Sequence, residues 1–161
     1  MTTPTVYEWG GGQDAFEKLT EVFYAKVLKD DLLGNLFQNM SSEHSKSVAH
    51  FLSEVLGGPK LYTGEDKRSH AHMISRHVGR KLDETERKRW VQLVLESADE
   101  IGMPDDAEFR SALVGYLEWG SRMVVKSSQI DENPIDEDAP MPRWGWGEAG
   151  DPSQLKPKDT E

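Results

Sequence analysis

The stretch DETERKRWVQLVLESADEIGMP, residues 83–104, contains the start, the body and the end of one helix. Its first residue, Asp83, can accept a hydrogen bond from the backbone of Glu86, whose side chain can reach back in return. Apolar residues then recur every three or four positions on one face, at Trp90, Val94, Ala98 and Ile101. Because Gly102 and Pro104 follow at once, the stretch predicts an amphipathic helix with both ends defined.

The same helical spacing continues through the rest of residues 1–127. It predicts helices over about 14–29 and 106–126, a turn of helix within 31–37, and a short helix over 71–77. A further helix begins after Ser41 and Ser42, carries its inner stripe on His44, Val48, Phe51, Leu52 and Val55, and ends at Gly57-Gly58-Pro59. No run alternates with a period of two for long enough to form a strand, so the predicted fold class is all-α.

Length and composition bound the kind of protein. A chain of 161 residues predicts one domain, and no segment approaches the ~20 consecutive apolar residues of a membrane span. The chain has no cysteine, which excludes disulfides, thiolate metal sites and covalent attachment of haem through thiols. The N-terminus lacks a secretory signal pattern, so we expect a cytoplasmic protein.

Charge is distributed unevenly along the chain. The net charge of −10 argues against nucleic acid or an anionic membrane as the main partner. Residues 128–161 are rich in Pro, Gly and Asp and lack an apolar period. The sequence therefore predicts a domain over 1–127 and an acidic, disordered tail over 128–161. Trp144 and Trp146 interrupt the polar tail, either because they dock onto the domain or because they bind a partner.

The chain has five histidines, of which His70, His72 and His77 lie in an irregular stretch at residues 60–82 and His44 and His50 lie in the helix predicted before it. An irregular loop of this length inside a small domain is usually functional. We expect His50 on the surface and His70 and His72 in a solvated basic loop. A zinc site made by His70, His72 and His77 lacks a recognised spacing and an obvious fourth ligand. For His44 and His77, spacing alone favours an ordinary structural role.

Several short motifs occur together in a specific order, namely Phe23-Tyr24, Leu36-Phe37, Gly57-Gly58-Pro59, Tyr62, Ser75-Arg76-His77 and Arg89-Trp90. This array resembles the truncated haemoglobins, and among them group II, which has a tryptophan in the distal pocket. The resemblance covers roughly residues 7–127. It implies a globin-like, two-over-two helical sandwich around a b-type haem (iron protoporphyrin IX).

The resemblance also implies roles for individual residues. His77 matches the proximal iron ligand, while Tyr24, Trp90 and His44 match positions that face a ligand on the distal side. Residues implied to contact the haem are Phe37, Val48, Leu52, Tyr62, Met73 and Arg76. The chain departs from the family at Ser69-His70-Ala71, where Gly-His-Pro is usual, and at His44, which is an uncommon choice and is itself open as a direct iron ligand.

Three functions follow from these observations as hypotheses. The first is a haem protein that binds O2, NO or CO at the distal face. The second is an NO dioxygenase or peroxidase-like enzyme, which would need an external reductase because the sequence contains no flavin or nicotinamide fingerprint. The third is a haem-free helical interaction module that uses the acidic tail.

Overall fold

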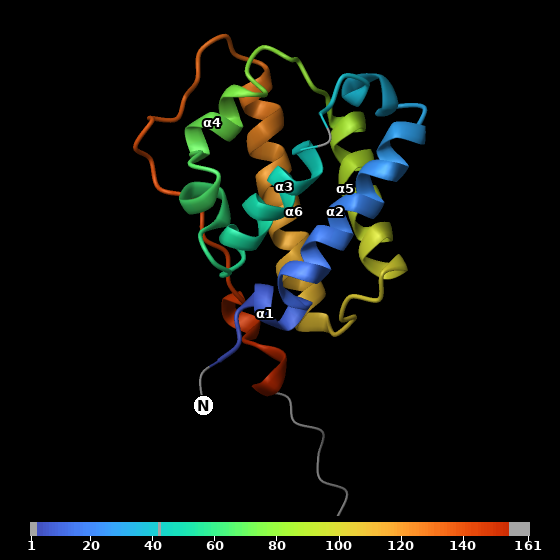
Figure 1. Ribbon diagram of the computed structural model, residues 1–161, viewed down its shortest axis with the longest axis vertical. Helices are drawn as coiled ribbons and strands as arrows, with labels where there is room; N and C mark the ends of the chain where they lie inside the picture. The colour runs from blue at the N-terminus through green and yellow to red at the C-terminus, as the bar shows by residue number, and fades with distance from the viewer. Residues whose placement is uncertain (1–2, 42, 155–161) are drawn as a thin grey trace, which may run out of the picture.

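The computed structural model describes residues 3–41 and 43–154, and within these ranges it contains helices and no strand. The predicted all-α class is therefore confirmed. The α-helices are α1 (Val6–Gly10), α2 (Gly12–Lys29), α3 (Glu43–Val55), α4 (His70–Ser75), α5 (Glu84–Glu100) and α6 (Ala107–Ser128) (Figure 1). Shorter helical turns are η1 (Gly34–Phe37), η2 (Leu61–Glu65), η3 (Gly147–Ala149) and η4 (Pro152–Gln154). No helix of the described ranges is long and apolar enough to cross a membrane.

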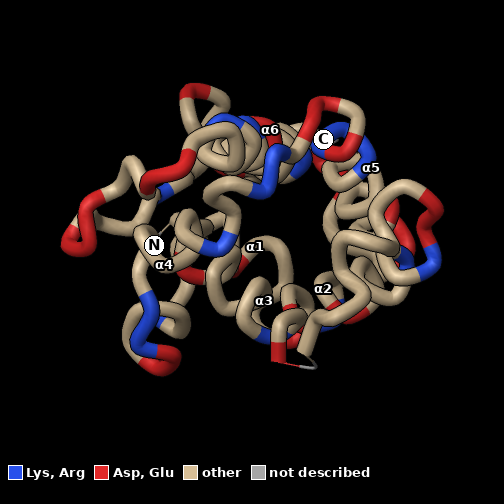
Figure 2. Tube along the Cα trace, turned by 90° about the horizontal axis from the view of Figure 1, so that it is seen from above, with Lys and Arg blue, Asp and Glu red and all other residues tan. Residues whose placement is uncertain are grey.

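The four long helices form two layers. Helix α2 packs against α3 in one layer, α5 packs against α6 in the other, and a contact between α2 and α5 joins them. Figure 2 shows α2 and α3 on one side of the molecule and α5 and α6 on the other. The largest fully buried side chains include Phe16, Leu19, Phe23, Phe109, Leu113 and Leu117. This arrangement is the predicted two-over-two sandwich.

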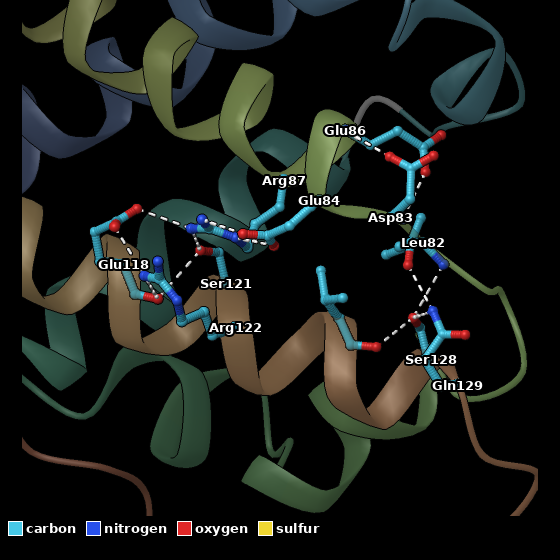
Figure 3. Close-up of polar contacts among 11 residues, drawn as sticks. Leu82, Asp83, Glu84, Glu86, Arg87, Glu118, Ser121, Arg122, Ser128 and Gln129 are labelled. Carbon is cyan, nitrogen blue, oxygen red and sulfur yellow. Dashed lines mark hydrogen bonds and ion pairs between the residues drawn. The ribbon is translucent and has the colours of Figure 1, made fainter.

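Helix α5 begins and ends as its sequence predicts. Asp83 accepts a hydrogen bond from the Glu86 backbone at 2.8 Å, and the Glu86 side chain accepts one from the Asp83 backbone at 2.9 Å (Figure 3). One turn later, the buried Arg87 guanidinium donates to Glu84 at 2.6 Å and to Glu118 of α6 at 2.8 Å. Because a buried cation is tolerated only when it is paired, Arg87 needs both carboxylates, and its bond to Glu118 also fixes α5 against α6.

The Gly57-Gly58-Pro59 stop after α3 has a packing role that the sequence did not predict. Gly57 has a φ of +97°, which favours glycine. At Gly58 a β-carbon would lie 2.7 Å from the Ser53 carbonyl oxygen and 2.8 Å from the Tyr7 ring. The pair of glycines therefore lets the end of α3 approach α1, where the Tyr7 amide donates to the Leu56 carbonyl at 2.9 Å.

Two sequence-based expectations need correction. The short helix predicted over 71–77 is His70–Ser75, so His77 lies in the turn that follows it. The tail predicted to be disordered instead follows the surface of the domain over residues 129–154, and residues 155–161 lie outside the described residues. The segment lies on the domain because Trp144 and Trp146 pack against the core. The large apolar area of these two rings favours docking, which the acidic composition of the segment did not indicate.

Candidate haem-binding site

Three long helices bring together a cluster of polar aromatic side chains. Tyr24 comes from α2, His44 from α3 and Trp90 from α5, and the Tyr24 hydroxyl lies 3.1 Å from His44 Nε2. Phe37 of η1 joins them, with its ring centroid 5.7 Å from that of Tyr24. Tyr24, His44 and Trp90 are the residues that the sequence resemblance proposed for the distal side, and Phe37 is one of the proposed haem contacts.

Phe23 supports this cluster and was not among the proposed site residues. Its buried ring lies 4.7 Å from the Tyr24 ring and 5.4 Å from the Trp90 ring, measured between centroids, with edge-to-face geometry in both pairs. Because it touches both polar aromatics, Phe23 fixes the spacing between α2 and α5 at the site. Its place in the apolar stripe of α2, directly before Tyr24, was the available signal.

Both members of the Tyr24–His44 pair are neutral at pH 7, and burial reinforces the neutral form of each. It raises the pKa of the Tyr24 hydroxyl far above its usual range, and a hydrogen bond with Trp90 partly opposes the rise. Burial is also the main cause that lowers the pKa of His44 from 6.5 to about 4, with the nearby positive charges of Arg76 and Arg68 adding to it. A neutral tyrosine retains the O–H that it needs to act as a donor.

His77 is oriented by the short helix before it. Its Nδ1 lies 2.9 Å from the Met73 carbonyl oxygen. Since a carbonyl can only accept, Nδ1 carries the proton and donates it, which leaves Nε2 with the lone pair in the neutral ring. Burial lowers the pKa of His77 and so favours that neutral form. A neutral imidazole held through Nδ1–H is the form that binds a metal through Nε2.

The remaining proposed contact residues differ in their exposure. Leu52 and Tyr62 are buried in the core, and the Tyr62 ring meets Phe51 edge to face at 5.1 Å. Val48 and Met73 are half-buried and pack against the same core. Arg76 is exposed, one residue before His77. These residues lie on α3, on α4 and in the segments after them.

Predictions for two of the other histidines were wrong. His50, expected on the surface, is 4% exposed, and its Nδ1 lies 2.8 Å from Asp66 because the segment after α3 folds back over the helix. His70, expected in a solvated loop, is 8% exposed at the start of α4. His72 is half-buried. Within the described ranges, no three His, Asp or Glu side chains gather as a candidate metal site.

The sequence matches the family described as bacterial-like globin over residues 5–118. A group 2 truncated hemoglobin of Bacillus subtilis is 27% identical over 121 residues, covering 75% of this chain and 89% of that protein. The crystal structure of the group II truncated hemoglobin from Bacillus anthracis superposes with a TM-score of 0.69 at 26% identity, covering 78% of this chain and 93% of the other. That of the truncated oxygen-avid haemoglobin from B. subtilis gives a TM-score of 0.66 at 28% identity, over 76% and 99% of the two chains.

These matches define a globin with the truncated helical sandwich. The chain belongs to the bacterial-like globin family, and its resemblance to the group II truncated haemoglobins is confirmed. Membership in this family makes it a haem-binding globin. The side chains fit such a group, since the neutral His77 ring offers an unprotonated Nε2, and His44, which contacts Tyr24, lies within electrostatic range of His77.

Proposed function

We propose that the chain binds a b-type haem through His77 Nε2 and holds O2, or another diatomic gas such as NO or CO, beside Tyr24, Trp90 and His44. The observation that carries this proposal is the His77–Met73 hydrogen bond, which fixes the tautomer and the orientation needed for a ligand. The Tyr24–His44 pair adds a polar, desolvated site within electrostatic range of that imidazole.

The haem would supply a ferrous iron at which diatomic gases bind reversibly. The protein's own contribution is orientation and electrostatics. Oriented donors stabilise the partial negative charge that O2 acquires in such a pocket, and they act strongly because water is excluded. The Tyr24 hydroxyl and the Trp90 indole N–H are such donors, and His44 supports them: when its Nε2 carries the proton it donates to the Tyr24 oxygen and leaves the Tyr24 O–H free for the ligand. The description of a B. subtilis structural neighbour as oxygen-avid supports this assignment.

Other side chains would form the walls of the pocket. We assign the packing surface of the haem to Phe37, Val48, Leu52, Tyr62 and Met73. Arg76 is exposed beside His77, and we assign it to a haem propionate, with which its guanidinium can pair bidentately. The half-buried state of Phe37, Val48 and Met73 supports this role, because these apolar groups still have surface to bury.

Hemin titration of the purified chain tests the proposal. The wild-type chain is expected to develop a strong Soret band with a one-to-one endpoint and to bind CO after reduction. His77→Ala is expected to lose the five-coordinate ferrous spectrum and to release hemin quickly. His72→Ala, which removes a half-buried histidine from the short helix just before His77, is the matched control and is expected to behave as wild type. A chain that stays colourless, or an unchanged spectrum in His77→Ala, would contradict the assignment.

A further inference from the structure

The segment at residues 70–82, which carries His77, is hydrogen-bonded to residues at the end of α6 and just after it. At its C-terminal end, the Lys81 amide donates to the Ser128 carbonyl at 2.9 Å and the Leu82 amide donates to the Ser128 hydroxyl at 3.0 Å. The Gln129 side-chain amide donates to the Leu82 carbonyl at 2.6 Å. Figure 3 shows Ser128 and Gln129 reaching Leu82 from the end of α6.

At the N-terminal end of the same segment, Asn133 makes the corresponding contact. Its side-chain amide donates to the Ala71 carbonyl in α4 at 2.8 Å, while its Oδ1 accepts from the Ile135 backbone at 2.9 Å and so fixes the amide. Among the described residues, each hydrogen bond that joins 70–82 to a sequence-distant position involves Ser128, Gln129 or Asn133.

The chain after Asn133 is anchored at its other end. The Trp144 amide donates to the Val55 carbonyl at the end of α3, and the Trp146 indole donates to the Pro4 carbonyl at 2.8 Å. The Trp144 ring lies 5.8 Å from Tyr116 and 5.9 Å from Trp119, two aromatic residues of α6. In Figure 1 this part of the chain runs from the end of α6 past α4 toward α1.

Helix α4 needs such support. It has six residues, too few to be stable alone, and within the described ranges it makes no extensive interface with another helix. Ile74 anchors the helix by its burial, and the Asn133 bond to Ala71 adds a polar restraint on the helix itself. The Ser128 and Gln129 bonds restrain the end of the segment at residues 81–82. The family match ends at residue 118, so these contacts come from outside the matched region.

We propose that residues 128–146 form a C-terminal strap that positions His77, with Asn133 as the principal positioning residue. The inference rests on the proposed role of His77 as the iron ligand. Within the strap, Ser128 accepts from Lys81 and Leu82, Asn133 donates to α4 at Ala71, and the Trp144 amide donates to the end of α3. It thereby sets the position of the His77 imidazole relative to the helix that carries His44.

Amide hydrogen exchange of the haem-free full-length chain tests whether the strap stabilises α4 and the turn that carries His77. Asn133→Ala is expected to raise exchange at residues 73–78 by about five-fold, the effect of one lost hydrogen bond, without changing exchange in α2 or α5. Asn133→Gln, which keeps the amide donor, is expected to restore part of the protection. Gln13→Ala is the matched control, since it removes an exposed side-chain amide bond to Glu17 in α2. Unchanged exchange at residues 73–78 in Asn133→Ala would overturn the proposal.

Resonance Raman spectra of the hemin-loaded, reduced chain test whether the strap also positions the His77 imidazole. The iron–histidine stretching band is expected to shift and broaden in Asn133→Ala, and to stay as in wild type in Gln13→Ala. An unchanged band together with faster exchange would mean that the strap stabilises α4 without positioning His77, which overturns the assignment. A wild-type chain that takes up no hemin would instead overturn the proposed function, and the exchange rates would still decide whether the strap holds the segment.

Discussion

The distal and proximal faces of the candidate haem site are built in different ways. The proposed distal residues Tyr24, His44 and Trp90 stand on three long helices, and the core residue Phe23 packs against two of them, Tyr24 and Trp90. The proximal His77 lies just beyond a six-residue helix. Its ring is fixed by a local bond to Met73, the helix is bonded by Asn133, and the chain after His77 is bonded at Leu82 by Ser128 and Gln129.

The two faces are therefore stabilised by different interactions. Packing of the long helices creates the distal face, so that face should persist without haem and should fail only when the whole fold fails. A few hydrogen bonds from a remote part of the chain hold the proximal segment, so it can loosen locally. The two faces should therefore respond differently to substitution.

Removal of the Phe23 ring should have the largest effect on stability. Phe23 is 2% exposed and touches both Tyr24 and Trp90, so Phe23→Ala leaves a cavity between α2 and α5. We expect a loss of about 3–5 kcal/mol in the free energy of unfolding of the haem-free chain. Urea denaturation followed by circular dichroism measures it. Met73→Ala, at a half-buried position of α4, should cost clearly less, and an equal loss would contradict the contrast between the faces.

Removal of a distal donor should have an intermediate effect, confined to ligand release. Tyr24→Phe and Trp90→Phe each remove one donor and keep an aromatic ring in the core. Since one hydrogen bond contributes about 1 kcal/mol, O2 should dissociate about five-fold faster in each variant, as measured by stopped-flow replacement with CO. Tyr116→Phe is the control, because it deletes the hydroxyl of a buried tyrosine on α6 beside Trp144. Unchanged release in both distal variants would show that these groups do not face the ligand.

The last prediction concerns the pH dependence of stability. The pKa of His44 is lowered by burial from 6.5 to about 4, so between these values the unfolded chain binds a proton that the folded chain does not. Stability should therefore fall as pH decreases from about 6.5 toward 4, and it should do so less in His44→Gln. Urea midpoints of the haem-free proteins at pH 7 and pH 5 measure the difference. Equal losses in the two proteins would mean that His44 is not buried as a neutral ring.

The long helices were predictable from sequence because local signals agree with their packing. Asp83 and Glu86 form the expected capping box. The stripe of Phe16, Leu19, Phe23 and Val27 is buried, as its spacing indicates. At such positions the same side chain defines the helix and fills the core, so periodicity alone predicts both.

The surroundings of the site were less predictable because they depend on contacts between distant segments. His50 is buried only because Asp66 folds back onto α3, and no local pattern reports that pairing. The segment after Ser128 is acidic, and this composition predicted disorder. Two single side chains, Asn133 and Trp144, instead fix where the segment lies. The roles of Tyr24, Trp90 and His77 came from the family resemblance, since spacing alone left His77 an ordinary histidine.

The ferrous, ligand-free spectrum of His77→Gly, with and without added imidazole, tests the central claim most directly. If His77 Nε2 holds the iron, the variant should lose the iron–histidine stretching band in resonance Raman spectra, and free imidazole should restore a band by occupying the vacated site. His44→Ala should keep the wild-type band, because its ring belongs to the opposite face. A wild-type band that persists in His77→Gly and disappears in His44→Ala would contradict the account and exchange the roles of the two histidines.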